Sequence, residues 1–220
     1  MKYKYIILDF GNVIAKSPSG DWDIIPKFEE LIDINKMNKS LFERVRKKYS
    51  YILSYHAQSL EEEYNLFLEY YDSILSNIKY EGYNKHIAEE IAYERTYTNK
   101  KYVLIDNIHN ELAKLKEKYK LILLTDNWPC VIPYLKDNNL DVYFEKVYVS
   151  SIYKCVKKDG IFFDYPIKDF NINPKEALFI DDAEENLSAA VTRGLDVLLM
   201  DRDNKIKKSK YQIIHDLNNI

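Results

Sequence analysis

Short apolar segments that stop at a polar or acidic residue recur along the chain. Apolar runs occupy residues 5–8, 121–124, 177–180 and 197–200, and residues 146–150 form a similar β-branched and aromatic segment. Apolar runs of this length, bounded by Asp, Gly or Thr, indicate buried β-strands. We therefore predict five strands at these positions.

Helical spacing of apolar positions fills the intervals between the later strands. Residues 107–119 carry apolar side chains at three- and four-residue spacing, and residues 183–193 do so ahead of Gly194, a natural helix C-cap. Buried strands that alternate with helices indicate an α/β fold with a parallel sheet and helices on both faces.

The stretch from residue 17 to residue 98 has a different pattern. It contains no strand-like run, and residues 40–56 and 84–95 show helical periodicity. Ser59-Leu60-Glu61-Glu62 forms a capping box that predicts the start of another helix. We predict an all-helical domain over 17–98, inserted into an α/β core made of residues 1–16 and 99–220.

Composition and charge narrow the possible partners and the cellular location. The net charge of −3 lacks the strong basic excess of nucleic-acid-binding proteins, and no apolar stretch reaches the roughly 18 residues of a membrane span. The N-terminal apolar run reaches Asp9 too early for a signal peptide, and the only cysteines are Cys130 and Cys155. We expect a cytoplasmic protein that binds neither nucleic acid nor membranes.

Acidic residues follow three of the predicted strands. Ligands of parallel α/β sheets bind at the carboxyl ends of the strands. Asp9 directly follows the first strand, where a carboxylate can attack an electrophile and form a covalent intermediate. A turn is the alternative interpretation of an Asp that ends a strand two residues before a Gly.

Two adjacent carboxylates, Asp181 and Asp182, follow the strand at residues 177–180. Neighbouring carboxylates repel each other, so a cation should stabilise them, and a hard oxygen-binding ion such as Mg²⁺ suits this need. An acidic helix start favoured by the helix dipole would also explain Glu184 and Glu185, but it explains the Asp pair poorly.

Four segments resemble, in their order along the chain, the four motifs of haloacid dehalogenase superfamily hydrolases. The first, second and fourth contain acidic or hydroxyl side chains, and the third contains a lysine. Ile7-Leu8-Asp9-Phe10-Gly11-Asn12-Val13-Ile14 is similar to the first motif, with Asp9 as the nucleophile. Thr125 matches the second-motif hydroxyl, although a Thr here could also be a helix N-cap. Asp181 and Asp182 match the acidic fourth motif.

The third motif of this superfamily is a lysine that pairs with the nucleophile and neutralises phosphate oxygens. Lys157 has the family's spacing from a strand and a serine, and Lys154 and Lys158 are close rivals. The family usually has Pro after this lysine, whereas Lys158 stands here.

The resemblance implies a Rossmann-like core, a helical cap formed by the insertion, and an aspartyl-phosphate intermediate made from a small phosphorylated metabolite. It also implies bound Mg²⁺. The expected metal ligands are Asp9, the Gly11 carbonyl, Asp181 and Asp182, and the expected substrate contacts are Gly11, Asn12, Asp126 and Asn127.

Two positions depart from the family pattern. Gly11 replaces the second Asp of the first motif, which protonates the leaving group, and such a group is typically worth about 10²–10⁴-fold in rate. Asp126 stands where the family commonly has Asn or Gly, and a carboxylate would repel a phosphate. The sequence leaves open whether Asp126 points at the substrate or away from it.

Three functions remain open on the sequence. The leading one is a Mg²⁺-dependent phosphatase. The second is a metal-independent carbon–halide hydrolase, for which Arg44 and Arg46 are the candidate halide receptors. The third is a catalytically weak protein that binds a phosphorylated ligand. The oligomeric state is left open.

Overall fold

The computed structural model describes residues 2–33, 36–54, 56–218 and 220, and it divides into two compact units. The core unit comprises residues 1–16, 104–127 and 131–220, and the inserted unit comprises residues 17–103 and 128–130. The sequence placed the second boundary at 98/99 and gave residues 128–130 to the core.

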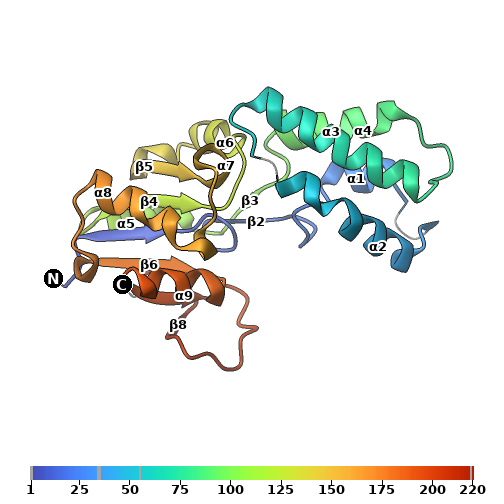
Figure 1. Cartoon of the computed structure of the whole chain (residues 1–220). Coiled ribbons are helices and arrows are strands. Elements are labelled where there is room, and N and C mark those ends of the chain that lie inside the picture. Colours follow the sequence, from blue (N-terminus) through green and yellow to red (C-terminus); the bar gives the residue numbers. More distant parts are fainter. Residues whose placement is uncertain (1, 34–35, 55, 219) are drawn as a thin grey trace. The chain divides into compact units, whose positions relative to one another are not determined.

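A six-stranded parallel sheet forms the centre of the core unit (Figure 1), in the order β5-β4-β1-β6-β7-β8. Its strands are β1 (Tyr5–Leu8), β4 (Lys120–Thr125), β5 (Phe144–Val149), β6 (Ala177–Asp181), β7 (Asp196–Met200) and β8 (Ile213–Ile214). The predicted α/β, Rossmann-like class is confirmed. The two-residue β8 was not predicted, because a run this short has no detectable periodicity.

Strand β1 lies between β4 and β6. Leu8 is aligned with Leu123 on one side and with Ile180 on the other, and the Asp9 N–H donates to the Ile180 carbonyl at 3.0 Å. Because all three strands are parallel, their carboxyl ends meet at one edge of the sheet. The residues that follow these three strands are therefore neighbours in space.

Helices flank this sheet and cover its apolar residues. They are α5 (Ile108–Lys116), α6 (Val131–Asp137), α7 (Ser150–Tyr153), α8 (Asp164–Asp169) and α9 (Glu184–Thr192), with the 3₁₀ turns η3 (Asp141–Tyr143), η4 (Lys157–Asp159), η5 (Ile161–Phe163) and η6 (Pro174–Glu176). Phe162, Phe163 and Phe179 are fully buried in one apolar cluster with Leu187 of α9. This packing fixes the positions of η4 and α9, which carry residues of the site described below.

The inserted unit is built from helices (Figure 1), which enclose an apolar cluster of their own. They are α1 (Pro26–Leu31), α2 (Lys39–Tyr49), η2 (Ser50–Ser54), α3 (Leu60–Asn77) and α4 (Lys85–Tyr97). Phe28, Phe67 and Tyr71 are each at most 1% exposed in this cluster. Ser59 accepts a hydrogen bond from the Glu62 N–H at 3.2 Å, so α3 begins at the predicted cap.

Two short strands, β2 (Ala15–Lys16) and β3 (Val103–Leu104), mark the ends of the insertion in the sequence. The chain leaves the core unit after β2 and returns to it at β3. Within the core unit, the Ile105 N–H donates to the Ile14 carbonyl at 3.0 Å. In the described part of the chain, no helix combines the length and the apolar character that crossing a bilayer requires.

Candidate active site

Asp9 and Lys157 form a buried ion pair at the carboxyl edge of the sheet. The Lys157 Nζ lies 2.5 Å from Asp9 Oδ1. Asp9 directly follows strand β1, which lies between β4 and β6. The Lys157 side chain is only 1% exposed, whereas Lys154 and Lys158 are exposed to solvent. We predicted Lys157 as the site lysine, with Lys154 and Lys158 as rivals, and the structure brings Lys157 to the nucleophile candidate.

Asp181 holds the same lysine from strand β6. The Lys157 Nζ donates to Asp181 Oδ2 at 2.6 Å, and Asp181 Oδ1 accepts from the Ala183 N–H at 2.8 Å. Asn186, in the first turns of α9, donates to both oxygens of Asp181 at 3.1 Å. Asp181 therefore has a fixed orientation. The sequence did not assign a role to Asn186, although its spacing places it one helical turn after the Asp pair.

Asp182 is bound from the loop that follows β1. Asn12 adopts a left-handed backbone conformation with φ of 51°, and its Nδ2 donates to Asp182 Oδ2 at 2.8 Å. Asn tolerates this backbone region better than most residues. Asn12, for which we predicted a substrate contact, thus connects the loops that carry Asp9 and Asp182.

The carboxylates of Asp9, Asp181 and Asp182 face one another at this site, and the Lys157 ammonium is the cation that pairs with two of them. Each of Asp9, Asp181 and Asp182 has an oxygen within 4.8 Å of the others. Burial raises the pKa of Asp9 to about 8 despite the Lys157 ammonium, and repulsion from Asp181 and Asp182 adds to the rise. Burial likewise raises the pKa of Asp182, so the site carries unbalanced negative charge when ionised.

The donor set fits a hard divalent cation. Carboxylate oxygens are the ligands that Mg²⁺ prefers, and a cation among these three would offset the charge that Lys157 leaves unbalanced. No other group of three or more His, Cys, Asp or Glu residues in the described part of the chain offers a comparable arrangement. Gly11, whose carbonyl we predicted as a ligand, forms an isolated bridge with Ala15.

Asp126 is directed at the backbone of Lys157. Its two carboxylate oxygens accept from the Lys157 N–H at 3.0 and 3.3 Å, and burial raises its pKa. We predicted a substrate contact for Asp126, whereas the structure shows its carboxylate bound to the peptide group of the site lysine. The contact between Asp126 and the substrate stays a prediction.

The remaining predicted site residues, Thr125 and Asn127, lie at the end of β4 and in the loop that follows it. Thr125 is 1% exposed at the carboxyl end of β4, the strand next to β1. The Asn127 N–H donates to Ser150 Oγ at 3.0 Å, which joins the loop after β4 to the start of α7. The sequence did not single out this serine as a support for the loop.

Arg202 fixes the loop after β1 from the far end of the chain. Its guanidinium donates to the Val13 carbonyl at 2.8 Å and pairs with Glu111 of α5 at 2.7 Å. Both side chains of the pair are at most 9% exposed. The sequence missed this contact because the residues are separated by more than ninety positions, and no local pattern connects them.

The arginines considered as halide receptors belong to the inserted unit. Arg46 pairs with Asp21 at 2.6 Å and with Asp23 at 2.8 Å, so two carboxylates neutralise its charge. Arg44 is exposed on α2. A halide receptor would be a buried cation without a carboxylate partner, and neither Arg44 nor Arg46 meets this description.

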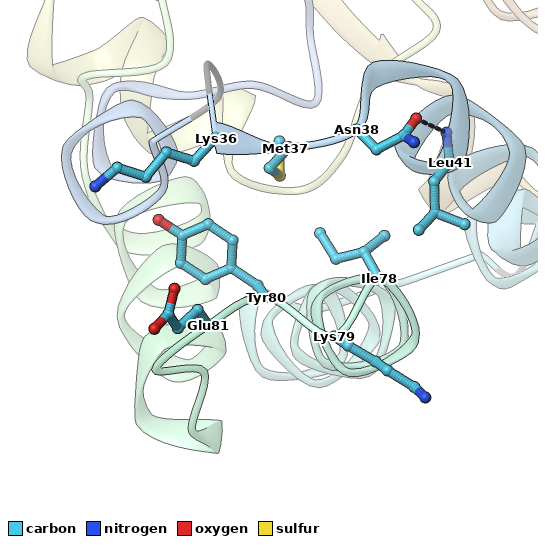
Figure 2. Close-up of a pocket in the computed structure, with 8 residues that line it drawn as sticks. All are labelled: Lys36, Met37, Asn38, Leu41, Ile78, Lys79, Tyr80 and Glu81. Atoms are coloured by element: carbon cyan, nitrogen blue, oxygen red, sulfur yellow. Dashed lines mark hydrogen bonds between the residues drawn. The ribbon is translucent and has the colours of Figure 1, made fainter.

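A cavity of about 470 Å³ lies in the inserted unit, between the start of α2 and the end of α3 (Figure 2). Met37, Ile78 and Tyr80 line it, and the ammonium groups of Lys36 and Lys79 extend away from Met37 and Ile78. None of the predicted catalytic residues lines this cavity. Polar residues line it as well, namely Lys36, Asn38, Lys79 and Glu81.

Comparison with known proteins identifies the family. The sequence profile of the haloacid dehalogenase-like hydrolase family matches residues 29–200, and no curated protein sequence matches the chain. The matched range contains β4, Lys157 and β6, and it begins after Asp9. The chain therefore belongs to the haloacid dehalogenase-like hydrolases.

Solved structures share this fold at low sequence identity. The HAD-hydrolase YfnB from Bacillus subtilis, bound to magnesium, has 17% identity and a TM-score of 0.69, with 100% of this chain and 97% of that chain covered. The HAD family enzyme bt-2542 from Bacteroides thetaiotaomicron, an alanine mutant in complex with magnesium and inorganic phosphate, has 22% identity, a TM-score of 0.63 and coverages of 93% and 97%.

The L-2-haloacid dehalogenase from Xanthobacter autotrophicus is similar to the same extent. It has 12% identity and a TM-score of 0.69, and the alignment covers 99% of this chain and 96% of that chain. Since magnesium-bound proteins and dehalogenases share the fold, the fold alone does not choose between the two chemistries.

Proposed function

We propose that the chain is a Mg²⁺-dependent phosphatase that acts on a small phosphorylated metabolite. The observation that carries this proposal is the cluster of Asp9, Asp181 and Asp182, whose oxygens lie within 4.8 Å of one another beside one lysine. A metal-independent dehalogenase has no need of this excess of negative charge. A phosphatase needs it, because the carboxylates bind the cation that offsets the charge of the phosphate.

In the proposed reaction, an Asp9 oxygen attacks the phosphorus atom, and the leaving oxygen departs as an anion that takes its proton from water. Asp9 then carries the phosphoryl group until a second water molecule hydrolyses the acyl phosphate. The Lys157 ammonium reduces the repulsion between the attacking carboxylate and the phosphate. The Thr125 hydroxyl binds a phosphoryl oxygen. Mg²⁺, held by Asp9, Asp181 and Asp182, would supply further charge neutralisation when bound.

Gly11 limits the leaving groups that this site can handle. The chain has no carboxylic acid two residues after Asp9 to protonate the departing oxygen. Such general acids contribute about 10²–10⁴-fold to the rate. We therefore expect slow turnover of simple alkyl phosphates and faster turnover of substrates with good leaving groups, such as acyl phosphates and sugar 1-phosphates.

Dehalogenases are among the solved structures of similar fold, so carbon–halide hydrolysis is the alternative function. The surroundings of Arg44 and Arg46, the two candidate halide receptors, argue against this alternative. A halide receptor must present an unneutralised cation, and Arg46 is bound by Asp21 and Asp23 while Arg44 is exposed. We therefore place carbon–halide hydrolysis second. A catalytically weak binder of phosphorylated ligands is the third possibility, and Gly11 is its support.

The test is a phosphatase screen of the purified chain with Mg²⁺ and with EDTA, over acyl phosphates, sugar phosphates and 2-haloacids. We expect phosphate release that requires Mg²⁺ and is abolished by Asp9→Asn, while Asp106→Asn at an exposed position leaves it unchanged. Halide release in EDTA would establish the dehalogenase instead. Tight binding of phosphorylated compounds without turnover would establish the binder.

A further inference from the structure

A second buried polar cluster lies in the inserted unit. Glu63 of α3 is fully buried, and Lys101 and Cys130 are each 4% exposed. Glu63 Oε2 accepts from the Cys130 N–H at 2.8 Å, and Glu63 Oε1 lies 3.4 Å from the Lys101 Nζ. The Tyr102 hydroxyl lies 3.9 Å from the Cys130 sulfur. The proposed phosphatase reaction uses none of these side chains.

The lysine nitrogen donates to the cysteine sulfur in a short, direct contact. The Lys101 Nζ lies 2.5 Å from the Cys130 Sγ, whereas N–H donors stay about 2.7–3.2 Å from oxygen acceptors, which are smaller than sulfur. Two single bonds that meet at one bent oxygen atom would hold a nitrogen and a sulfur well inside their contact distance. The two atoms are therefore close enough for a single oxygen atom to bridge them.

We propose that Lys101 and Cys130 form a reversible N–O–S crosslink when dioxygen oxidises the protein. The thiol loses its S–H bond and the amine loses one N–H bond. One atom of dioxygen bonds to both sulfur and nitrogen, and the other leaves as water with the two hydrogens. Sulfur and nitrogen are oxidised and dioxygen is reduced, so the step needs no further reactant.

Glu63 suits this chemistry because its carboxylate touches both partners. If the lysine begins as an ammonium, its additional proton can pass to the Glu63 oxygen that lies 3.4 Å from its Nζ. The other Glu63 oxygen fixes the Cys130 backbone and so keeps the sulfur beside the amine. Reduction by four thiols, which become two disulfides, restores the free lysine and cysteine and releases the bridging oxygen as water.

Burial decides which oxidants can reach the pair. Burial raises the pKa of the Cys130 thiol to about 12, and a protonated, enclosed thiol reacts poorly with bulky disulfides. Dioxygen is small and uncharged, so it can enter a protein interior. Enclosure by the surrounding side chains also limits the water and the second oxidant that would carry the sulfur further to sulfinic acid.

The crosslink would connect two segments that matter for the proposed enzyme. Cys130 lies five residues after Thr125, and Lys101 lies at the end of the inserted unit, shortly before the chain returns to the core. An oxygen bridge between them closes a covalent loop through residues 102–129, which include α5 and β4. Oxidation would thus restrain the segment that follows the Thr125 hydroxyl.

Intact-mass and peptide mass spectrometry of the full chain test this proposal. We expect the aerated protein to gain the mass of one oxygen less two hydrogens, with the change located on a linked pair of peptides containing Lys101 and Cys130. Dithiothreitol should remove the added mass. Cys155→Ser is the matched control, because the second cysteine belongs to the core unit, and it should retain the crosslink.

Cys130→Ser and Lys101→Arg should abolish the change in mass. If aerated wild-type protein instead yields Cys130 that alkylates fully after denaturation, or Cys130 oxidised without a link to Lys101, the proposal is overturned. The wild-type peptide map decides this even if the variants fail to fold. It is also independent of whether the chain hydrolyses phosphate esters.

Discussion

Lys157 is the residue on which the charge balance of the candidate site depends. It is the ammonium that pairs with both Asp9 and Asp181, and these two carboxylates hold its pKa above the usual range although burial opposes the charge. A buried ion pair that loses one partner leaves an uncompensated charge in a medium that solvates it poorly.

We expect Lys157→Met to lower the free energy of unfolding by about 3–5 kcal/mol, the usual cost of removing one partner of a buried ion pair. The measurement is urea unfolding in EDTA, so that added metal does not replace the lost charge. Lys158→Met, at the exposed neighbouring position, should change stability by less than about 0.5 kcal/mol. Equal unfolding midpoints for the two variants would contradict the role assigned to Lys157.

Asp126 should act as a positioning residue for that lysine. Asp126→Ala removes the acceptor of the Lys157 N–H, and an unsatisfied buried donor costs about 1–3 kcal/mol. Asp126→Asn keeps one acceptor oxygen, so we expect it to retain most of the stability and most of the phosphatase activity. Unfolding curves and steady-state rates for the pair of variants check this. A larger loss in the Asn variant than in the Ala variant would refute it.

Individual residues could be predicted from the sequence only where they follow a recognisable strand. Asp9, Thr125 and Asp181 end apolar runs, and this local context marked them as site candidates. Lys157 lies in an irregular segment among other lysines, so only the family's spacing predicted it, and Lys154 and Lys158 stayed as rivals until the contact with Asp9 was seen. Arg202 was missed because its partners are distant in the sequence.

At the scale of elements, α9 shows how a helix end is fixed. It runs over Glu184–Thr192 and is followed by Gly194, which has φ of +82°. A Cβ at Gly194 would lie 3.4 Å from the Pro174 Cβ. That distance is an ordinary van der Waals contact, so the predicted C-cap glycine is required by the backbone conformation.

We expect Gly194→Ala to destabilise the protein by about 1–2 kcal/mol, because residues with a Cβ are disfavoured in the left-handed region. Gly20→Ala is a useful comparison, since Gly20 has φ of +81° but nothing within 4 Å of its Cβ position. Thermal unfolding should show the larger loss at Gly194. A Gly194→Ala protein as stable as the wild type would show that this end of α9 can relax.

The elements were predictable to different degrees. Strands β1, β4 and β6 are buried on both faces of the sheet, so they are continuous apolar runs, and the amphipathic helices α3 and α5 follow from their spacing. The 3₁₀ turn η4, which contains Lys157, has no such signal, because its three residues are held by tertiary contacts. The sequence therefore predicted the sheet well and the segment that delivers the lysine poorly.

At the scale of the whole molecule, the proposed cation should stabilise the folded chain. A ligand that binds only the folded state at a hundred times its dissociation constant contributes about 2.7 kcal/mol. We expect Mg²⁺ to raise the melting temperature of the wild type and of Asp106→Asn, and to have little effect on Asp182→Asn. Differential scanning fluorimetry with EDTA reversal measures this. An unchanged melting temperature in millimolar Mg²⁺ would count against the metal site.

The position of β1 between β4 and β6 has a consequence for synthesis on the ribosome. Residues 5–8 emerge among the first of this chain, yet their partners at residues 120–123 and 177–180 are translated much later. Until then this apolar strand has neither neighbour, which exposes it to aggregation and makes chaperone binding advantageous. The nucleophile candidate therefore lacks its surroundings until residues 177–180 are translated, and a nascent chain stalled before residue 177 should be inert.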